Sequence, residues 1–172
     1  MKKLVCLSIG LLCFWAISAQ KLKVNTIDKF TQFVFKETTE ESFGTDFINN
    51  FRFTFKLKYS EKQYSMPAVI TFGKQVQYDE NSGIALLLDD NSTIRLYSRY
   101  SGLSTPIPNF KGEVYFYSFK TEFFLNEDQV SKLRDHKVTD IRIYYMDVDG
   151  VYDYKLKSKK QMLIQRMLKL FD

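Results

Sequence analysis

Hydrophobic and polar side chains alternate along much of this chain, and this pattern predicts β-strands. The clearest run is 51–59, where phenylalanine, leucine and tyrosine occupy every second position and arginine, threonine and lysine lie between them. A period of two places the apolar side chains on one face of a strand and the basic ones on the other. Similar patterns predict strands at 30–38, 68–72, 84–88, 93–100, 114–124, 138–146 and 151–156.

For two of these strands the sequence also predicts a boundary or an environment. Pro67 lacks a backbone N–H, so we expect its strand to begin after it, at Ala68. The strand at 114–124 starts with apolar side chains on both faces, which is typical of a central strand covered on both sides.

Turn and helix signals supply the rest of the predicted architecture. Asp89-Asp90-Asn91-Ser92 and Asp149-Gly150 each predict a β-hairpin. A short helix is expected at 127–135, with Asn126 as its N-cap and Gln129 at the capping-box position. From Ser158, a plausible N-cap, the apolar period becomes helical and predicts an amphipathic C-terminal helix.

The predicted class is therefore α+β and mainly antiparallel β. We expect a curved sheet, a sandwich or a partly closed barrel, with one short helix and the C-terminal amphipathic helix packed against it.

The first nineteen residues have the order of a secretory signal peptide. Lys2 and Lys3 precede an apolar run at 4–17, and Ser18-Ala19 provides small residues for cleavage. We therefore expect a signal peptide at 1–19 and a single β-rich domain at 20–172. The mature protein would be periplasmic or extracellular, and not transmembrane after cleavage, because the apolar run is short for a membrane span.

Removal of this segment changes the chemistry available to the mature chain. Both cysteines, Cys6 and Cys13, lie within it, so thiol nucleophiles and cysteine metal sites are excluded after cleavage. The formal net charge is +5, and loss of Lys2 and Lys3 leaves +3. Nucleic-acid binders usually present a clustered basic face, so we expect no nucleic-acid partner.

Few residues point to catalysis or to a metal. The one histidine, His136, lies near a helix end, and the chain has neither a G-x-S-x-G motif nor a glycine-rich phosphate loop. We therefore predict no catalytic residue and no cofactor. Asp147, Asp149 and Asp153 are candidate calcium ligands, but a hairpin tip explains them equally well without a metal, and we favour that interpretation.

Two groups of side chains are candidates for binding. Exposed tyrosines would suggest recognition of a sugar or a protein, and buried ones would belong to the core. A basic cluster around the last strand and helix could face an anionic partner, including a membrane surface, although a solvated face is the favoured interpretation. The tyrosines are Tyr97, Tyr100, Tyr144, Tyr145, Tyr152 and Tyr154, and the basic residues are Lys155, Lys157, Lys159, Lys160, Arg166 and Lys169.

These observations leave two functional hypotheses. The first is an exported, non-enzymatic binding or structural module of the bacterial cell envelope, with a protein or a glycan as its partner. The alternative is a small carrier of apolar ligands or lipids, in which the C-terminal helix closes a cavity. Exposed rings would favour the first hypothesis and an apolar cavity under the helix would favour the second.

Overall fold

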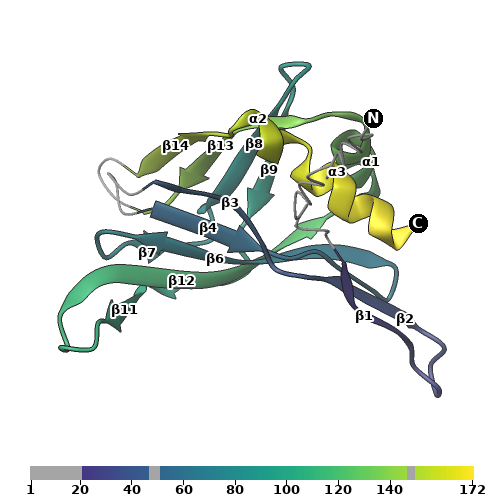
Figure 1. Cartoon of the computed structure of the whole chain (residues 1–172), viewed down its shortest axis with the longest axis horizontal. Helices are drawn as coiled ribbons and strands as arrows, with labels where there is room; N and C mark the ends of the chain where they lie inside the picture. The colour runs from purple at the N-terminus through teal and green to yellow at the C-terminus, as the bar shows by residue number, and fades with distance from the viewer. Residues whose placement is uncertain (1–20, 47–50, 147–149) are drawn as a thin grey trace, which may run out of the picture.

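The computed structural model describes residues 21–46, 51–146 and 150–172. The predicted signal peptide, Asp147 and Asp149 lie outside these ranges. Strands make up 54% of the structure and helices 15%, and the strands pair antiparallel, so the predicted fold class is confirmed. The strands are arranged as a sandwich of curved sheets with helices at one end (Figure 1).

The larger sheet has the strand order β1-β2-β5-β6-β12-β11, and the β3–β4 hairpin joins it because β4 also pairs with β6. The long strand β6 therefore pairs with β5 near its start and with β4 near its end, while β12 lies along its other side. The bounds are β1 Leu22–Ile27, β2 Val34–Thr38, β3 Glu41–Asp46, β4 Phe51–Phe55, β5 Lys58–Ser60, β6 Gln63–Phe72, β11 Thr105–Pro108 and β12 Val114–Leu125.

Pro67 lies inside β6, so the prediction that this strand begins at Ala68 is wrong. The reason is a break in the neighbouring strand. The predicted strand at 51–59 is interrupted between β4 and β5, and at this break Lys56 N donates to Pro67 O. Proline is tolerated in a sheet where an irregularity removes the need for its N–H.

The smaller sheet has the order β14-β13-β8-β9, and β7 pairs separately with β10. The pairs β8–β9 and β13–β14 are antiparallel, which confirms both predicted hairpins. The bounds are β7 Gln77–Tyr78, β8 Gly83–Leu88, β9 Thr93–Tyr97, β10 Gly102–Leu103, β13 Val138–Tyr144 and β14 Val151–Lys155.

The core lies between the two sheets. Phe53 and Phe123 of the larger sheet and Ile84 and Ile143 of the smaller sheet are fully buried in one cluster. Along β6 and β13 most of the buried side chains alternate with more exposed ones, so each sheet has one face in the core and one outer face.

Helix α1 (Glu127–Asp135) has the predicted bounds and the predicted capping box between Asn126 and Gln129. The C-terminal helix is divided into α2 (Ser158–Gln161), α3 (Leu163–Leu168) and a 3-10 turn, η1 (Lys169–Phe171). Its N-cap is Lys157, so the prediction of Ser158 as the cap is wrong. The apolar side chains of α3 lie in the same core cluster as the sheets.

Two hairpins extend beyond the sandwich, at opposite ends of the larger sheet (Figure 1). One is formed by β1 and β2, and the other by β11 and the first part of β12. The start of β12 therefore lies outside the core: Val114, Tyr115 and Phe116 are 41%, 55% and 39% exposed. The prediction that this segment is covered on both sides is wrong, because only the second half of β12 reaches the core.

Candidate binding surfaces

The outer face of the smaller sheet groups side chains that are far apart in the sequence. In the register of the sheet, Ala85 of β8 lies between Arg95 of β9 and Arg142 of β13, and Arg142 is paired with Asp153 of β14. In the next row, Gly83 lies between Tyr97 and Tyr144. We call Tyr97, Arg95, Tyr144, Arg142 and Asp153 the tyrosine–arginine face.

Arg95 is held between two tyrosine rings. Its guanidinium carbon lies 3.3 Å from the ring centroid of Tyr144 and 5.3 Å from that of Tyr97. Its Nη2 also donates to Asn81 O over 2.8 Å. An arginine over an aromatic face is attracted by the ring's negative potential. The stacking therefore fixes the orientation of both Arg95 and Tyr144 before any ligand arrives.

Arg142 and Asp153 form a bidentate pair beside this stack. The Arg142 Nε and Nη2 atoms donate to the two Asp153 carboxylate oxygens over 2.6 and 2.7 Å. These two hydrogen bonds lower the pKa of Asp153 and keep it ionised. Both side chains are more than half exposed, so the pair contributes little to stability and stays accessible to a ligand.

A shallow hollow of about 350 Å³ lies on this outer face, next to the stack. Its floor includes the small or apolar side chains Ala85 and Leu87, and its polar walls include Arg142 and Asp153, with the ring of Tyr144 at one side. The hollow thus combines donors, an acceptor and an aromatic ring in one place.

The six predicted tyrosines fall into separate groups. Tyr97 and Tyr144 lie on the tyrosine–arginine face. Tyr100 is 49% exposed and lies close to Arg99, whose guanidinium carbon is 5.6 Å from its ring centroid. The remaining three pack against the core, and these are Tyr145, Tyr152 and Tyr154.

Two of the three inward tyrosines, both on β14, contact the opposite sheet. Tyr152 Oη donates to Asp46 Oδ2 over 2.8 Å, and its ring lies 4.4 Å from that of Phe51. Tyr154 covers Gly44 so closely that a Cβ there would overlap its ring. These contacts join β14 to the β3–β4 hairpin of the other sheet.

The predicted basic cluster is only partly a free surface. Lys155, Lys157, Lys159 and Lys169 are exposed. Lys160 Nζ lies 3.8 Å from Glu41 Oε2, and Arg166 Nη2 donates to Lys159 O over 2.8 Å. Lys160 therefore links the C-terminal helix to β3, and Arg166 links α3 to α2 within that helix.

His136 and Asp153 have local partners. His136 caps the end of α1, and its Nδ1 and Nε2 atoms lie 3.1 and 3.5 Å from carboxylate oxygens of Asp89 and Asp90 on the β8–β9 turn. Asp153 is the described member of the calcium candidate and is paired with Arg142. Within the described ranges, no three acidic, histidine or cysteine residues are grouped as metal ligands would be.

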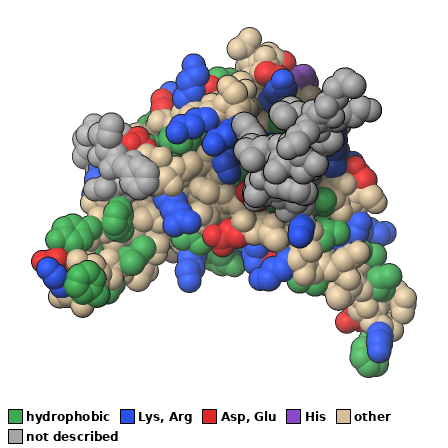
Figure 2. Space-filling view, viewed as in Figure 1, with side chains coloured by type: hydrophobic (Ala, Val, Ile, Leu, Met, Phe, Trp, Pro, Cys, Tyr) green, Lys and Arg blue, Asp and Glu red, His purple; other side chains and the backbone are tan. Residues whose placement is uncertain are grey.

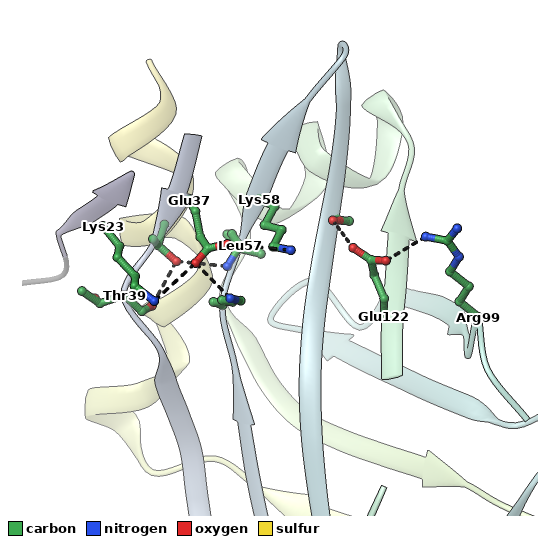
Figure 3. A network of polar contacts seen from close by, with 10 residues as sticks. Lys23, Glu37, Thr39, Leu57, Lys58, Arg99 and Glu122 are labelled. Carbon is green, nitrogen blue, oxygen red and sulfur yellow. Dashed lines mark hydrogen bonds and ion pairs between the residues drawn. The ribbon is translucent and has the colours of Figure 1, made fainter. Parts of the chain in front are cut away.

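The outer face of the larger sheet carries a polar network that the sequence did not suggest. The nearly buried carboxylate of Glu37 in β2 lies 2.9 Å from Lys56 Nζ and 3.8 Å from Lys23 Nζ and Lys58 Nζ (Figure 3). Further along the same face, Glu122 accepts from Ser65 Oγ over 2.8 Å and from Arg99 Nη1 over 2.9 Å (Figure 3). The only signal in the sequence was the row of basic residues on one face of 51–59.

Among the described residues, no helix combines the length and the apolar character needed to cross a bilayer. No family model, curated protein or solved structure matches the chain. The geometry of these surfaces is therefore the basis on which a function can be inferred.

Proposed function

We propose that this chain is an exported, non-enzymatic binding module of the bacterial cell envelope, and that its tyrosine–arginine face binds a glycan. Export follows from the signal peptide that the sequence predicts at 1–19. We choose this surface because Arg95 stacks on Tyr144 beside the solvent-exposed Arg142–Asp153 pair.

The chemistry of this surface suits a sugar. A sugar ring presents an apolar C–H face and a rim of hydroxyls. In the hollow, the Tyr144 ring and the apolar floor could contact the C–H face, and Arg142 and Asp153 could form hydrogen bonds with the hydroxyls. Its volume of about 350 Å³ falls in the range of about 300–1,000 Å³ that is typical of small-ligand sites. Because contacts within the protein already orient Arg95 and Arg142, binding costs little side-chain entropy.

The carrier hypothesis has less support. Leu163, Ile164 and Met167 of α3 are buried among core residues of the sheets, so the apolar side of this helix fills the core. This favours a module that binds at its surface.

The test is a binding titration of the purified protein with peptidoglycan fragments and with neutral and acidic oligosaccharides. For the glycan that binds, Tyr144→Ala should raise the Kd by about tenfold, or about 1.4 kcal/mol, because it removes the stacking ring and releases Arg95. Tyr115→Ala is the matched control, since Tyr115 is also exposed but lies on the β11–β12 hairpin. Equal affinity of Tyr144→Ala and wild type would rule out this face as the glycan site.

A further inference from the structure

The two projecting hairpins end in phenylalanines that contact almost nothing. Phe30, in the turn between β1 and β2, is 96% exposed, and Phe110, in the turn between β11 and β12, is 94% exposed. Ile27 and Tyr115 beside them are 60% and 55% exposed. Exposed apolar side chains that are grouped, as they are at each tip, are candidates for contact with a membrane or with another protein.

Both tips are held in defined conformations. Asp28 Oδ1 accepts hydrogen bonds from Phe30 N and Thr31 N over 2.9 and 2.7 Å. In the other turn, Asn109 Oδ1 accepts from Lys111 N and Glu113 N over 2.8 and 3.1 Å. These side-chain turns fix the backbone, so the phenylalanines stay presented to solvent.

The two tips point to the same side of the molecule. In Figure 1 both hairpins bend away from the smaller sheet, and Figure 2 shows apolar side chains together with basic and acidic ones at each tip. The outer face of the larger sheet spans the distance between them. One flat surface can therefore touch both tips at once.

The surface between the two tips is positively charged. At the tips themselves each lysine has a carboxylate nearby: Asp28 and Lys29 precede Phe30, and Lys111, whose Nζ lies 5.7 Å from the ring centroid of Phe110, is followed by Glu113. Between the hairpins, Arg52 and Lys120 are exposed on the outer face of the larger sheet, and Figure 2 shows further basic side chains along this edge. The carboxylates of Glu37 and Glu122 are already engaged by lysines and by Arg99.

From these features we propose that the protein docks on an anionic phospholipid surface, with Phe30 and Phe110 inserted among the headgroups. Phenylalanine and flanking lysines are the combination that interfacial membrane anchors use: the rings enter the acyl boundary and the cations attract anionic lipids. A protein partner fits less well, because protein interfaces place their apolar side chains in a continuous centre with a polar rim. Here the apolar groups lie at two ends and the polar face lies between them.

This proposal goes beyond glycan binding and does not depend on it, since the tyrosine–arginine face lies on the opposite side of the sandwich. A protein bound to lipid through its hairpins would leave that face free.

The first test is co-sedimentation of the purified protein with vesicles of phosphatidylcholine and phosphatidylglycerol, compared with vesicles of phosphatidylcholine alone. We expect binding to the anionic vesicles that weakens with added salt. Each of Phe30→Ser and Phe110→Ser should lower the partition coefficient by about tenfold, because each removes one buried ring. Tyr97→Ser is the control: it also removes an exposed ring, but from the opposite face, and should bind as wild type does.

A second measurement detects insertion directly. The only tryptophan of the chain, Trp15, lies in the predicted signal peptide. The mature protein therefore has no tryptophan, and its emission spectrum serves as the blank for Phe30→Trp and Phe110→Trp. Both reporters should shift to shorter wavelength with the anionic vesicles. The proposal is overturned if wild type does not sediment with them, or if Phe30→Ser/Phe110→Ser binds equally well. It is also overturned if the protein sediments equally well without vesicles, and the phenylalanine variants abolish that sedimentation, because the rings would then cause self-association and not lipid binding.

Discussion

At the scale of single residues, two inward-facing tyrosines differ in what their hydroxyls contact. Tyr78 is almost completely buried and stacks on Phe119 with 3.9 Å between ring centroids. Its hydroxyl has no hydrogen-bond partner among the described residues, and burial raises its pKa. The hydroxyl of Tyr152, by contrast, donates to Asp46. The ring of Tyr78 therefore stabilises the core, whereas its hydroxyl carries an uncompensated desolvation cost.

Tyr78→Phe should raise the free energy of unfolding by about 1 kcal/mol, because it removes a buried polar group that lacks a partner and keeps the stacked ring. Tyr152→Phe is the matched control and should lower it by about 1 kcal/mol, since a hydrogen bond is lost. Urea unfolding of the three proteins measures both changes. A clear loss of stability in Tyr78→Phe would contradict this account and would indicate a partner for the hydroxyl.

At the scale of elements, Glu37 links several strands through one carboxylate. Its partners come from β1, from β5 and from the break between β4 and β5. A nearly buried carboxylate is stable only when cations or hydrogen-bond donors surround it. Lys56 and Lys58 supply the positive charge, and because both are only partly exposed, solvent screens their attraction to Glu37 only in part.

Glu37→Gln should therefore lower the free energy of unfolding by about 2 kcal/mol, because three lysines would then face a neutral group. Glu61→Gln, in the exposed turn between β5 and β6, is the control and should change stability by less than about 0.5 kcal/mol. Equal unfolding midpoints for the two variants would show that the network does not hold these strands together.

The helices and strands also show which parts of the fold local sequence patterns can predict. Helix α1 was predictable because its capping box and first-turn acids are local signals. β1 was not predicted, since Leu22 and Val24 are its only half-buried side chains and give a weak pattern. The same limit explains the error at Pro67, whose tolerance depends on an irregularity in the neighbouring strand.

The candidate site could be predicted only in part, because it is assembled across strands. The sequence identified Tyr97 and Tyr144 as tyrosines to inspect, but it did not separate them from Tyr152 and Tyr154, which face the core. Arg95 reaches Tyr144 only because β8 pairs with both β9 and β13. Long-range pairing of this kind has no signature in local periodicity.

At the scale of the whole molecule, the sandwich separates two surfaces with different chemistry. The outer side of the smaller sheet carries the tyrosine–arginine face. The outer side of the larger sheet lies between two hairpins (Figure 1) whose turns expose Phe30 and Phe110. We propose that the second side rests on lipid while the first is presented to envelope glycans. Crossed variants keep the two proposals apart, since Tyr97→Ser tests the first surface and Phe30→Ser the second.

The most direct test of the central claim is a map of backbone amide chemical shifts during titration with the glycan that binds most tightly. The account predicts that the shifting amides cluster on β8, β9, β13 and β14, around Arg95, Tyr144 and Asp153, while the amides of the two hairpin tips stay unchanged. Shifts confined to the hairpins, or to the exposed lysines near α2, would contradict the assignment of the tyrosine–arginine face as the binding surface.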